Sequence, residues 1–201
     1  MCNLYRMTKA TAEVARIFGV TNRAEGGNRG ELVFPGFPGL VIAESEVRQM
    51  NWGFPLQQVS RKTGKPIKPK TVTNTRDDKL HSPFWRDSFT QRRCLIPLTA
   101  FAEAEGEYGS MTRTWLSVPD EETFAIAGIW RNSQEWGPVY SMVTSNPNTQ
   151  TAAIHDRMPV VLHPADHARW TDGTPDEAIS LCQPYSGTMI IERTSVPWVE
   201  R

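Results

Sequence analysis

The sequence lacks three features that often assign a protein to a broad class: a long apolar run, an excess of charge of one sign, and paired cysteines. No segment approaches the about 18 consecutive apolar residues that span a bilayer, so we expect no membrane partner. The 22 basic and 22 acidic residues balance, so any site for a polyanion has to be a local patch. The N-terminal residues show no signal-peptide pattern.

The few cysteines have no CxxC spacing; they are Cys2, Cys94 and Cys182. An odd number of cysteines without a secretion signal is typical of free thiols in a reducing compartment, and we expect a cytoplasmic protein. His163 and His167 lie four residues apart, but no third ligand accompanies them. The sequence therefore predicts no metal site.

The second residue carries the most chemical information. Cys2 follows the initiator methionine, which is normally removed when so small a residue comes next. Removal leaves one residue with both a free α-amine and a thiol, whose ordinary pKa values are near ~8 and ~8.5. An amine attacks an aldehyde to give a Schiff base, and a neighbouring thiol can close onto that imine as a five-membered ring. Taken alone, a cysteine at this position also occurs often by chance.

Short apolar and β-branched segments separated by turns predict an α+β fold over residues 1–201. We expect a single domain with a mostly antiparallel, barrel-like β-sheet core and a few peripheral helices. The first helix is predicted to be capped by Thr8 and ended by Gly19. Residues 21–30 and 57–71 are predicted to be polar loops. We expect the protein to be a monomer.

Between Gln57 and Arg76 the sequence has six basic residues and no acidic one. The six are Arg61, Lys62, Lys65, Lys68, Lys70 and Arg76. In a protein without net charge, such a run can lie along a phosphate backbone. Composition alone favours a solvated, mobile loop, so both interpretations stay open at this point.

Several other segments carry groups suited to chemistry. Glu103 ends an apolar segment, where a partly buried carboxyl group has a raised pKa suited to proton transfer; an acidic surface turn is the alternative. His155 can move protons near neutral pH, although a histidine at the start of a strand is more often structural. Arg157 can hold an anion through a forked contact. Asn74 and Arg76 end the basic run.

Seven short motifs follow one another along the chain. They are Met1-Cys2, Asn51-Trp52-Gly53-Phe54-Pro55, Asn74-Thr75-Arg76-Asp77-Asp78, Arg93-Cys94-Leu95-Ile96-Pro97, Phe101-Ala102-Glu103, Ala127-Gly128-Ile129-Trp130 and His155-Asp156-Arg157-Met158-Pro159-Val160-Val161-Leu162. In type and order they resemble the SOS response-associated peptidase (SRAP) family, the abasic-site-processing proteins of bacteria and eukaryotes. The motifs around Cys94 and His155 are the most specific. The resemblance implies one SRAP-like domain.

The resemblance also implies a mechanism that needs no metal and no organic cofactor. The freed amine of Cys2 attacks the ring-opened aldehyde of an abasic site in single-stranded DNA, and the thiol closes a thiazolidine that crosslinks protein and DNA. By the match, Asn74 orients the amine, Glu103 transfers protons, and His155 assists opening of the sugar. Two arginines hold phosphates beside the lesion, Arg76 and Arg157. Such a protein acts in the DNA damage response, at the nucleoid.

The chain departs from the family pattern next to these residues. Leu4 stands where the family has an arginine suited to holding a phosphate. Ala102 and Ala104 replace two aromatic residues on either side of Glu103, which we expect to remove stacking support for a base or sugar. We therefore expect the chemistry of the family to be retained and its DNA contacts to be altered.

Two other functions stay open. The family is also credited with proteolytic removal of whatever precedes Cys2, and an N-terminal-nucleophile peptidase or amidohydrolase would use the same residues with turnover of its substrate. A non-catalytic nucleic-acid-binding module would use the basic residues 61–76 and would not need Cys2.

Overall fold

The computed structural model describes residues 2–24 and 30–199. Within them, the strands in chain order are β1 (Leu4–Arg6), β2 (Thr21–Asn22), β3 (Leu32–Val33), β4 (Pro38–Ala43), β5 (Glu46–Trp52), β6 (Phe54–Val59), β7 (Pro66–Val72), β8 (Asn74–Arg76), β9 (Arg93–Leu98), β10 (Ala100–Glu105), β11 (Thr112–Ser117), β12 (Phe124–Ser133), β13 (Gly137–Ser145), β14 (Met158–Pro159), β15 (Val161–Leu162) and β16 (Ile190–Pro197). The helices are α1 (Thr11–Phe18), η1 (Asp77–Lys79), α2 (Arg86–Gln91), η2 (Pro164–Asp166), α3 (His167–Asp172) and α4 (Pro175–Ser180).

Five strands close into a barrel, in the order β13, β12, β9, β4 and β5. Neighbours in this order pair antiparallel, and a parallel pairing of Val139 with Asn51 and Tyr140 with Trp52 joins β13 back to β5. The strands are made largely of buried apolar residues, and closure leaves no free edge for these five strands to expose. The predicted α+β fold with a barrel-like sheet is confirmed.

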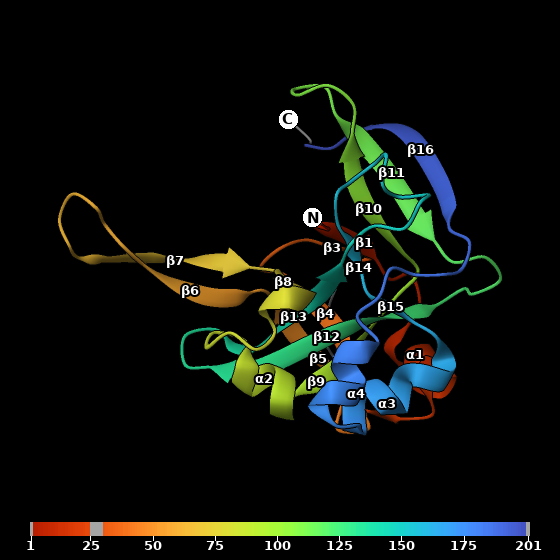
Figure 1. Cartoon of the computed structure of the whole chain (residues 1–201), viewed down its shortest axis with the longest axis horizontal. Coiled ribbons are helices and arrows are strands. Elements are labelled where there is room, and N and C mark those ends of the chain that lie inside the picture. The colour runs from red at the N-terminus through yellow and green to blue at the C-terminus, as the bar shows by residue number, and fades with distance from the viewer. Residues whose placement is uncertain (1, 25–29, 200–201) are drawn as a thin grey trace.

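A second sheet lies beside the barrel and carries the N-terminus. Its strands follow the order β16, β11, β10, β1 and β3, all antiparallel (Figure 1). In this sheet Tyr5 pairs with Phe101 and Glu103 pairs with Thr114. Because side chains alternate along a strand, Phe101 and Glu103 point to the face that meets the barrel, and Ala102 points to the other.

A pair of buried tyrosines fastens β1 to the barrel. The hydroxyl groups of Tyr5 and Tyr140 are hydrogen-bonded at 2.5 Å, and Trp52 packs edge-on against Tyr5 with ring centroids 5.1 Å apart. Gly39 on β4 makes this pairing possible, because a Cβ atom there would lie 2.0 Å from the Tyr5 hydroxyl oxygen and 2.1 Å from that of Tyr140. The strand that follows Cys2 is therefore fixed from inside the barrel.

The helices cover the barrel at one end, where α1, α3 and α4 gather (Figure 1). The prediction that Thr8 caps α1 is wrong: the N-cap is Ala10, without a side-chain cap, and the exposed Thr8 lies before it. Lys9 pairs with Glu13 and Glu122, which stabilises the extended segment ahead of the helix. The predicted end at Gly19 is confirmed, with a φ of 65°.

The two predicted polar loops have different outcomes. The loop over residues 21–30 lies partly outside the described residues, and the part within them contains strand β2. The prediction of a loop over residues 57–71 is wrong. These residues largely form a β-hairpin of β6 and β7, which projects from the body of the protein (Figure 1). We call residues 54–72 the arm. The arm is stabilised by cross-strand hydrogen bonds and buries neither face along most of its length. Its sequence therefore has no apolar pattern from which the two strands could be predicted.

Candidate active site around Cys2

Cys2 lies directly before β1, and it is buried to 1% exposure. Its Sγ donates to the carbonyl oxygen of Leu4 at 3.4 Å. Leu4 pairs with Ala102 on β10. Because Glu103 follows Ala102, the start of the chain lies beside Glu103. Burial raises the pKa of the Cys2 thiol well above its usual range, and the nearby Glu103 carboxylate raises it further. At neutral pH the group is therefore a thiol, and a base has to remove its proton when it reacts.

Glu103 projects from β10 into the junction between the second sheet and the barrel. Its side chain is 4% exposed. Burial raises the pKa of Glu103 to about 7. A carboxyl group with this pKa is present in both protonation states near neutral pH, which suits a residue that both accepts and donates protons. The predicted buried carboxyl at the end of an apolar segment is thus in place.

Asn74, the first residue of β8, contacts Cys2 directly. Its Nδ2 donates to the carbonyl oxygen of Cys2 at 2.8 Å and to the Thr73 hydroxyl at 2.9 Å. Its Oδ1 is buried and has no hydrogen-bond partner among residues 2–24 and 30–199. A buried amide oxygen without a partner is costly, and such atoms mark places where a further donor is expected.

Thr73 fixes the position of Asn74. The carbonyl oxygen of Thr73 accepts from the backbone N–H of Met142 at 2.9 Å, from Ser141 at 3.0 Å and from the indole N–H of Trp52 at 3.1 Å. Its hydroxyl group donates to Oδ1 of Asn3 at 3.3 Å, so a side chain next to Cys2 is joined to the same cluster. Thr73 was not predicted from the sequence, where its place immediately before Asn74 was the only signal.

His155 lies in the loop before β14. The backbone N–H of Arg157 lies 3.0 Å from its Nδ1. Burial lowers the pKa of His155, against an opposing contribution from Asp156, whose Oδ1 lies 2.8 Å from Nδ1. Asp156 is 87% exposed, so solvent weakens its influence, and the imidazole is neutral at neutral pH.

The loop of His155 reaches the rest of the site through β13. This strand pairs with β14 on one side, Ser145 opposite Met158, and with β8 on the other, Met142 opposite Asn74. The charge of Asp156 contributes to the raised pKa of Glu103, which places this loop in the same electrostatic environment. The fold therefore brings the loop of His155 to the neighbourhood of Cys2, Asn74 and Glu103.

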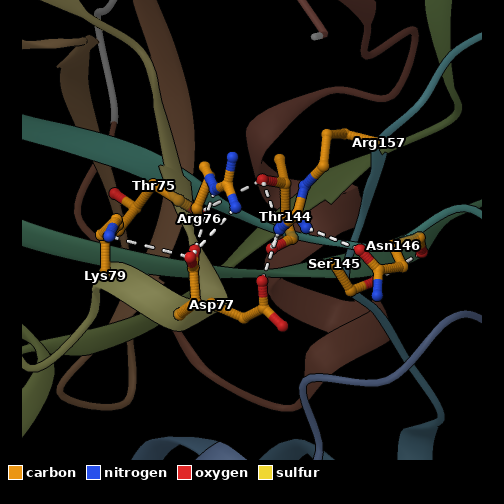
Figure 2. A network of polar contacts seen from close by, with 9 residues as sticks. Thr75, Arg76, Asp77, Lys79, Thr144, Ser145, Asn146 and Arg157 are labelled. Carbon is orange, nitrogen blue, oxygen red and sulfur yellow. Dashed lines mark hydrogen bonds and ion pairs between the residues drawn. The ribbon is translucent and has the colours of Figure 1, made fainter.

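The two candidate arginines are in different environments. Arg157 is 9% exposed, and its guanidinium donates to Asn146 Oδ1 at 3.0 Å, to Asp77 Oδ1 at 2.5 Å and to the carbonyl oxygen of Thr144 (Figure 2). These contacts fasten the His155 loop to β13 and η1, and they occupy the side chain. Its partner Asp77 belongs to the motif that begins at Asn74, whereas Asn146 carried no signal in the sequence.

Arg76 is available to a ligand. Its guanidinium pairs only with Asp78 among the described residues, at 2.9 and 3.0 Å, and both side chains are about half exposed. An exposed pair of this kind contributes little to stability, so a phosphate can replace the carboxylate at small cost.

The departures from the family pattern lie on the far face of the second sheet. Ala102 packs with Leu4 and Trp115 in a small apolar cluster, which Trp198 also contacts. Glu103 points to the opposite face, so an aromatic side chain in place of Ala102 would not lie against the Glu103 carboxylate. The geometry therefore does not support the expectation that Ala102 removes stacking support next to Glu103. The cavity on this side, of about 380 Å³, is lined by Leu4, Trp198 and neighbouring residues.

No three His, Cys, Asp or Glu side chains within the described ranges are grouped as metal ligands. His167, one of the two histidines considered for zinc, stacks on Phe18 with ring centroids 5.6 Å apart. None of the helices in the described part of the chain is both long and apolar enough to cross a membrane. Cys94 and Cys182 are buried and free, as packing residues are.

Comparison with known proteins identifies a family for this arrangement. Residues 1–197 match the family described as SOS response associated peptidase (SRAP). The abasic site processing protein YoqW of Bacillus subtilis is 31% identical over 123 residues, which cover 57% of this chain and 55% of YoqW. The abasic site processing protein YoaM of the same organism is 29% identical over 155 residues, 71% of this chain and 65% of YoaM. The matches thus span about half to two thirds of the relatives' length.

Solved structures with the same fold come from two other bacteria. A protein from Bacteroides thetaiotaomicron superposes with a TM-score of 0.79 at 22% identity, covering 96% of this chain and 91% of that one. A protein from Bordetella bronchiseptica also gives a TM-score of 0.79, at 20% identity, with 96% and 99% covered. At these identities the likeness shows the fold alone.

Proposed function

The chain belongs to the SOS response associated peptidase (SRAP) family, and from this premise we propose that it captures abasic sites in single-stranded DNA covalently through Cys2. Relatives named abasic site processing proteins support the substrate. The observation that carries the proposal is the contact of Asn74 with the Cys2 backbone beside a buried carboxyl group whose pKa is near 7.

The first step joins the α-amine of Cys2 to the aldehyde carbon of the ring-opened sugar. It requires removal of Met1, which frees the amine. The nitrogen lone pair forms the C–N bond, and loss of one water gives the imine. Oδ1 of Asn74 is the buried acceptor suited to an N–H of this amine, while Nδ2 holds the Cys2 carbonyl oxygen at 2.8 Å. The amide would thus aim the lone pair at the carbon.

The second step closes the thiazolidine ring. The sulfur of Cys2 attacks the imine carbon, the electron pair of the C=N bond moves to nitrogen, and the thiol proton ends there. Burial keeps this group protonated, so a base is needed as the S–C bond forms. Glu103, with its pKa of about 7, is suited to take the proton and return it to nitrogen. The product is protein plus DNA minus one water.

His155 and Arg76 would act on the sugar and the strand. A neutral imidazole can donate its ring proton to the sugar ring oxygen as the ring opens. Arg76 can exchange Asp78 for a phosphate next to the lesion. Arg157 is already engaged, so its proposed role is to hold the loop of His155 rather than to contact a phosphate.

The two steps can be separated with Cys2→Ser and Cys2→Ala in protein that lacks Met1. Wild-type protein mixed with a single-stranded oligonucleotide carrying one abasic site should give a band that survives denaturing electrophoresis. Cys2→Ser and Cys2→Ala both keep the amine and lose the thiol, so their adducts should persist only after borohydride reduction of the imine. If the wild-type protein binds the oligonucleotide but gives no band that survives denaturation, the result would instead favour a non-catalytic nucleic-acid-binding module.

The family's description as a peptidase favours a second activity of the same residues. The Cys2 thiol can attack the carbonyl carbon of Met1, with Glu103 taking the thiol proton and giving it to the departing Cys2 nitrogen. Water then hydrolyses the thioester and restores the thiol. If this activity exists, Glu103→Gln should retain Met1 when the protein is made in cells that lack methionine aminopeptidase, whereas the wild type should lose it. Retention of Met1 by both proteins would contradict self-processing.

A further inference from the structure

The arm (residues 54–72) takes no part in the proposed reaction, yet it carries five exposed cationic side chains. Its cations are all exposed, and none pairs with a carboxylate among the described residues; they are Arg61, Lys62, Lys65, Lys68 and Lys70. Acidic residues are absent from the arm. Such a concentration of unpaired cations in a protein with no net charge indicates an anionic partner.

The arm is rigidly attached at its base. Gly53, with a φ of 124°, turns the chain out of the barrel into β6. The guanidinium carbon of Arg131 lies 4.3 Å from the centre of the buried Phe54 ring, and Arg131 donates to the carbonyl oxygen of Pro55 at 3.2 Å. Beyond these contacts the two strands pair mainly with each other, so the arm is fixed at its root and open to solvent along its length.

The root of the arm is part of the candidate active site. β7 ends at Val72, and Thr73 and Asn74 follow directly, so the strand leads into the residue that contacts Cys2. The indole N–H of Trp52, at the other end of the root, donates to the carbonyl oxygen of Thr73. Figure 1 shows the arm leaving the body beside β8, near the N-terminus. DNA held at Cys2 would therefore pass close to the arm.

The side chains of the arm are suited to a phosphate backbone and not to stacked bases. Lys68 and Lys70 alternate with Pro69 and so share one face of β7, where Lys70 is paired with Leu56. No aromatic residue occurs between Pro55 and Val72, whereas proteins that track single strands rely on aromatic stacking. A two-stranded β-ribbon also fits into the major groove of duplex DNA.

We propose that the arm lies along the phosphate backbone of duplex DNA that flanks the lesion, and thereby favours abasic sites next to a base-paired segment. This inference rests on the proposed function, because it takes DNA at Cys2 as given. The six residues of β6 extend over roughly 20 Å, the length of about six base pairs. Leu4 stands where the family has an arginine and cannot hold a phosphate. The arm would thus supply affinity for DNA that this position does not.

The test compares two variants with equal loss of charge. One replaces the four lysines of the arm with glutamine: Lys62, Lys65, Lys68 and Lys70. The matched control replaces four exposed arginines off the arm: Arg16, Arg23, Arg86 and Arg169. Affinity is measured by fluorescence anisotropy against salt concentration in a Cys2→Ala background. The probes carry an abasic analogue without an aldehyde, so that no imine forms, and are a single strand alone and the same strand with a hairpin duplex on its 5′ or its 3′ side.

The arm variant should bind the better duplex-flanked probe about tenfold more weakly near 0.1 M salt, with a salt slope shallower by about 0.9 for each phosphate that the arm no longer neutralises. Its affinity for the single strand should change less, and the control variant should match the parent protein. Equal slopes for the arm and control variants would overturn the inference. Equal reductions in affinity for single-stranded and duplex-flanked probes would overturn the assignment to duplex DNA.

A separate measurement keeps the inference distinct from the proposed function. With Cys2 present and DNA at saturation, the arm variant should crosslink at the wild-type rate, because the arm touches no reacting atom. Failure of the wild type to crosslink would count against the proposed chemistry, while the binding data from the Cys2→Ala background would still decide the role of the arm.

Discussion

At the residue scale, one buried carboxyl group governs the proposed chemistry. We predict that Glu103→Gln slows crosslinking by about 100-fold or more, because glutamine can neither take the thiol proton nor return it. The wild-type rate should change with pH around 7, where Glu103 titrates, and the variant should lose this dependence. Single-turnover rates between pH 5.5 and 8.5 test both points. An unchanged pH profile in the variant would exclude Glu103 as the proton carrier.

Glu103→Gln slows the proposed reaction, but we predict that it raises the free energy of unfolding at alkaline pH. The pKa of Glu103 is higher in the folded protein, about 7 against an ordinary 4.5, so the native state binds more protons between these values and becomes less stable as pH rises through them. A pKa difference of this size corresponds to about 3 kcal/mol. Glu103→Gln should therefore be more stable than wild type at pH 8 and not at pH 4. Urea unfolding at the two pH values measures the difference.

Arg157 and Arg76 should respond differently to replacement by alanine. Arg157→Ala leaves Asp77 and Asn146 without their partner and should cost about 3 kcal/mol of unfolding free energy. Arg76→Ala removes an exposed pair and should leave the melting temperature nearly unchanged while weakening DNA binding. Calorimetry and DNA titration of both variants test this. A stable Arg157→Ala protein that binds DNA poorly would return Arg157 to the role of a phosphate ligand.

Asp156 should oppose DNA binding. Its exposed carboxylate contributes electrostatically to the environments of both Arg76 and Glu103, so it lies where a phosphate would approach. We predict that Asp156→Asn binds abasic DNA about two- to threefold more tightly at low salt, and that the difference vanishes near 1 M salt. A difference that persists at high salt would show that the carboxylate acts through structure and not through charge.

At the scale of elements, β1 depends on its fastening to the barrel. We predict that Gly39→Ala destabilises the protein by about 2 kcal/mol, because its Cβ would collide with the hydroxyl groups of Tyr5 and Tyr140. Displacement of β1 would also move Cys2 and slow crosslinking. Gly30→Ala is the control, since its Cβ would meet nothing closer than 3.8 Å. Equal stability of the two variants would show that β1 adjusts without cost.

Elements that bury apolar residues could be predicted from the sequence, and the arm could not. The end of α1 at Gly19 follows from local chemistry and occurs as expected. The arm has Gly64, three prolines and mostly polar residues, which are typical of a loop. Its strands are stabilised by pairing with each other, an interaction that hydrophobic periodicity does not report.

The sequence predicted which residues form the candidate site but not the contacts between them. The motifs pointed to Cys2, Asn74 and Glu103, but only the folded chain joins Asn74 to the Cys2 carbonyl. The registration of β10 decides that Ala102 points away from Glu103. The partners that occupy Arg157 come from segments far apart in the sequence, so its engagement could not be foreseen.

At the scale of the whole molecule, a closed barrel, a second sheet and an arm meet at one place. The barrel supplies Asn74 through β8 and β13, and the second sheet supplies Cys2 and Glu103. The arm ends two residues before Asn74. The predicted barrel-like fold was the right framework, but the position of the arm beside the site came only from the structure.

The central claim is covalent capture through Cys2, and intact-mass spectrometry tests it most directly. Protein proven to lack Met1 is mixed with a single-stranded oligonucleotide carrying one abasic site and measured under denaturing conditions, beside Cys2→Ala. The proposed chemistry predicts a species with the mass of protein plus oligonucleotide minus one water, absent from the variant without reductant. Absence of this species from the processed wild-type protein would contradict covalent capture.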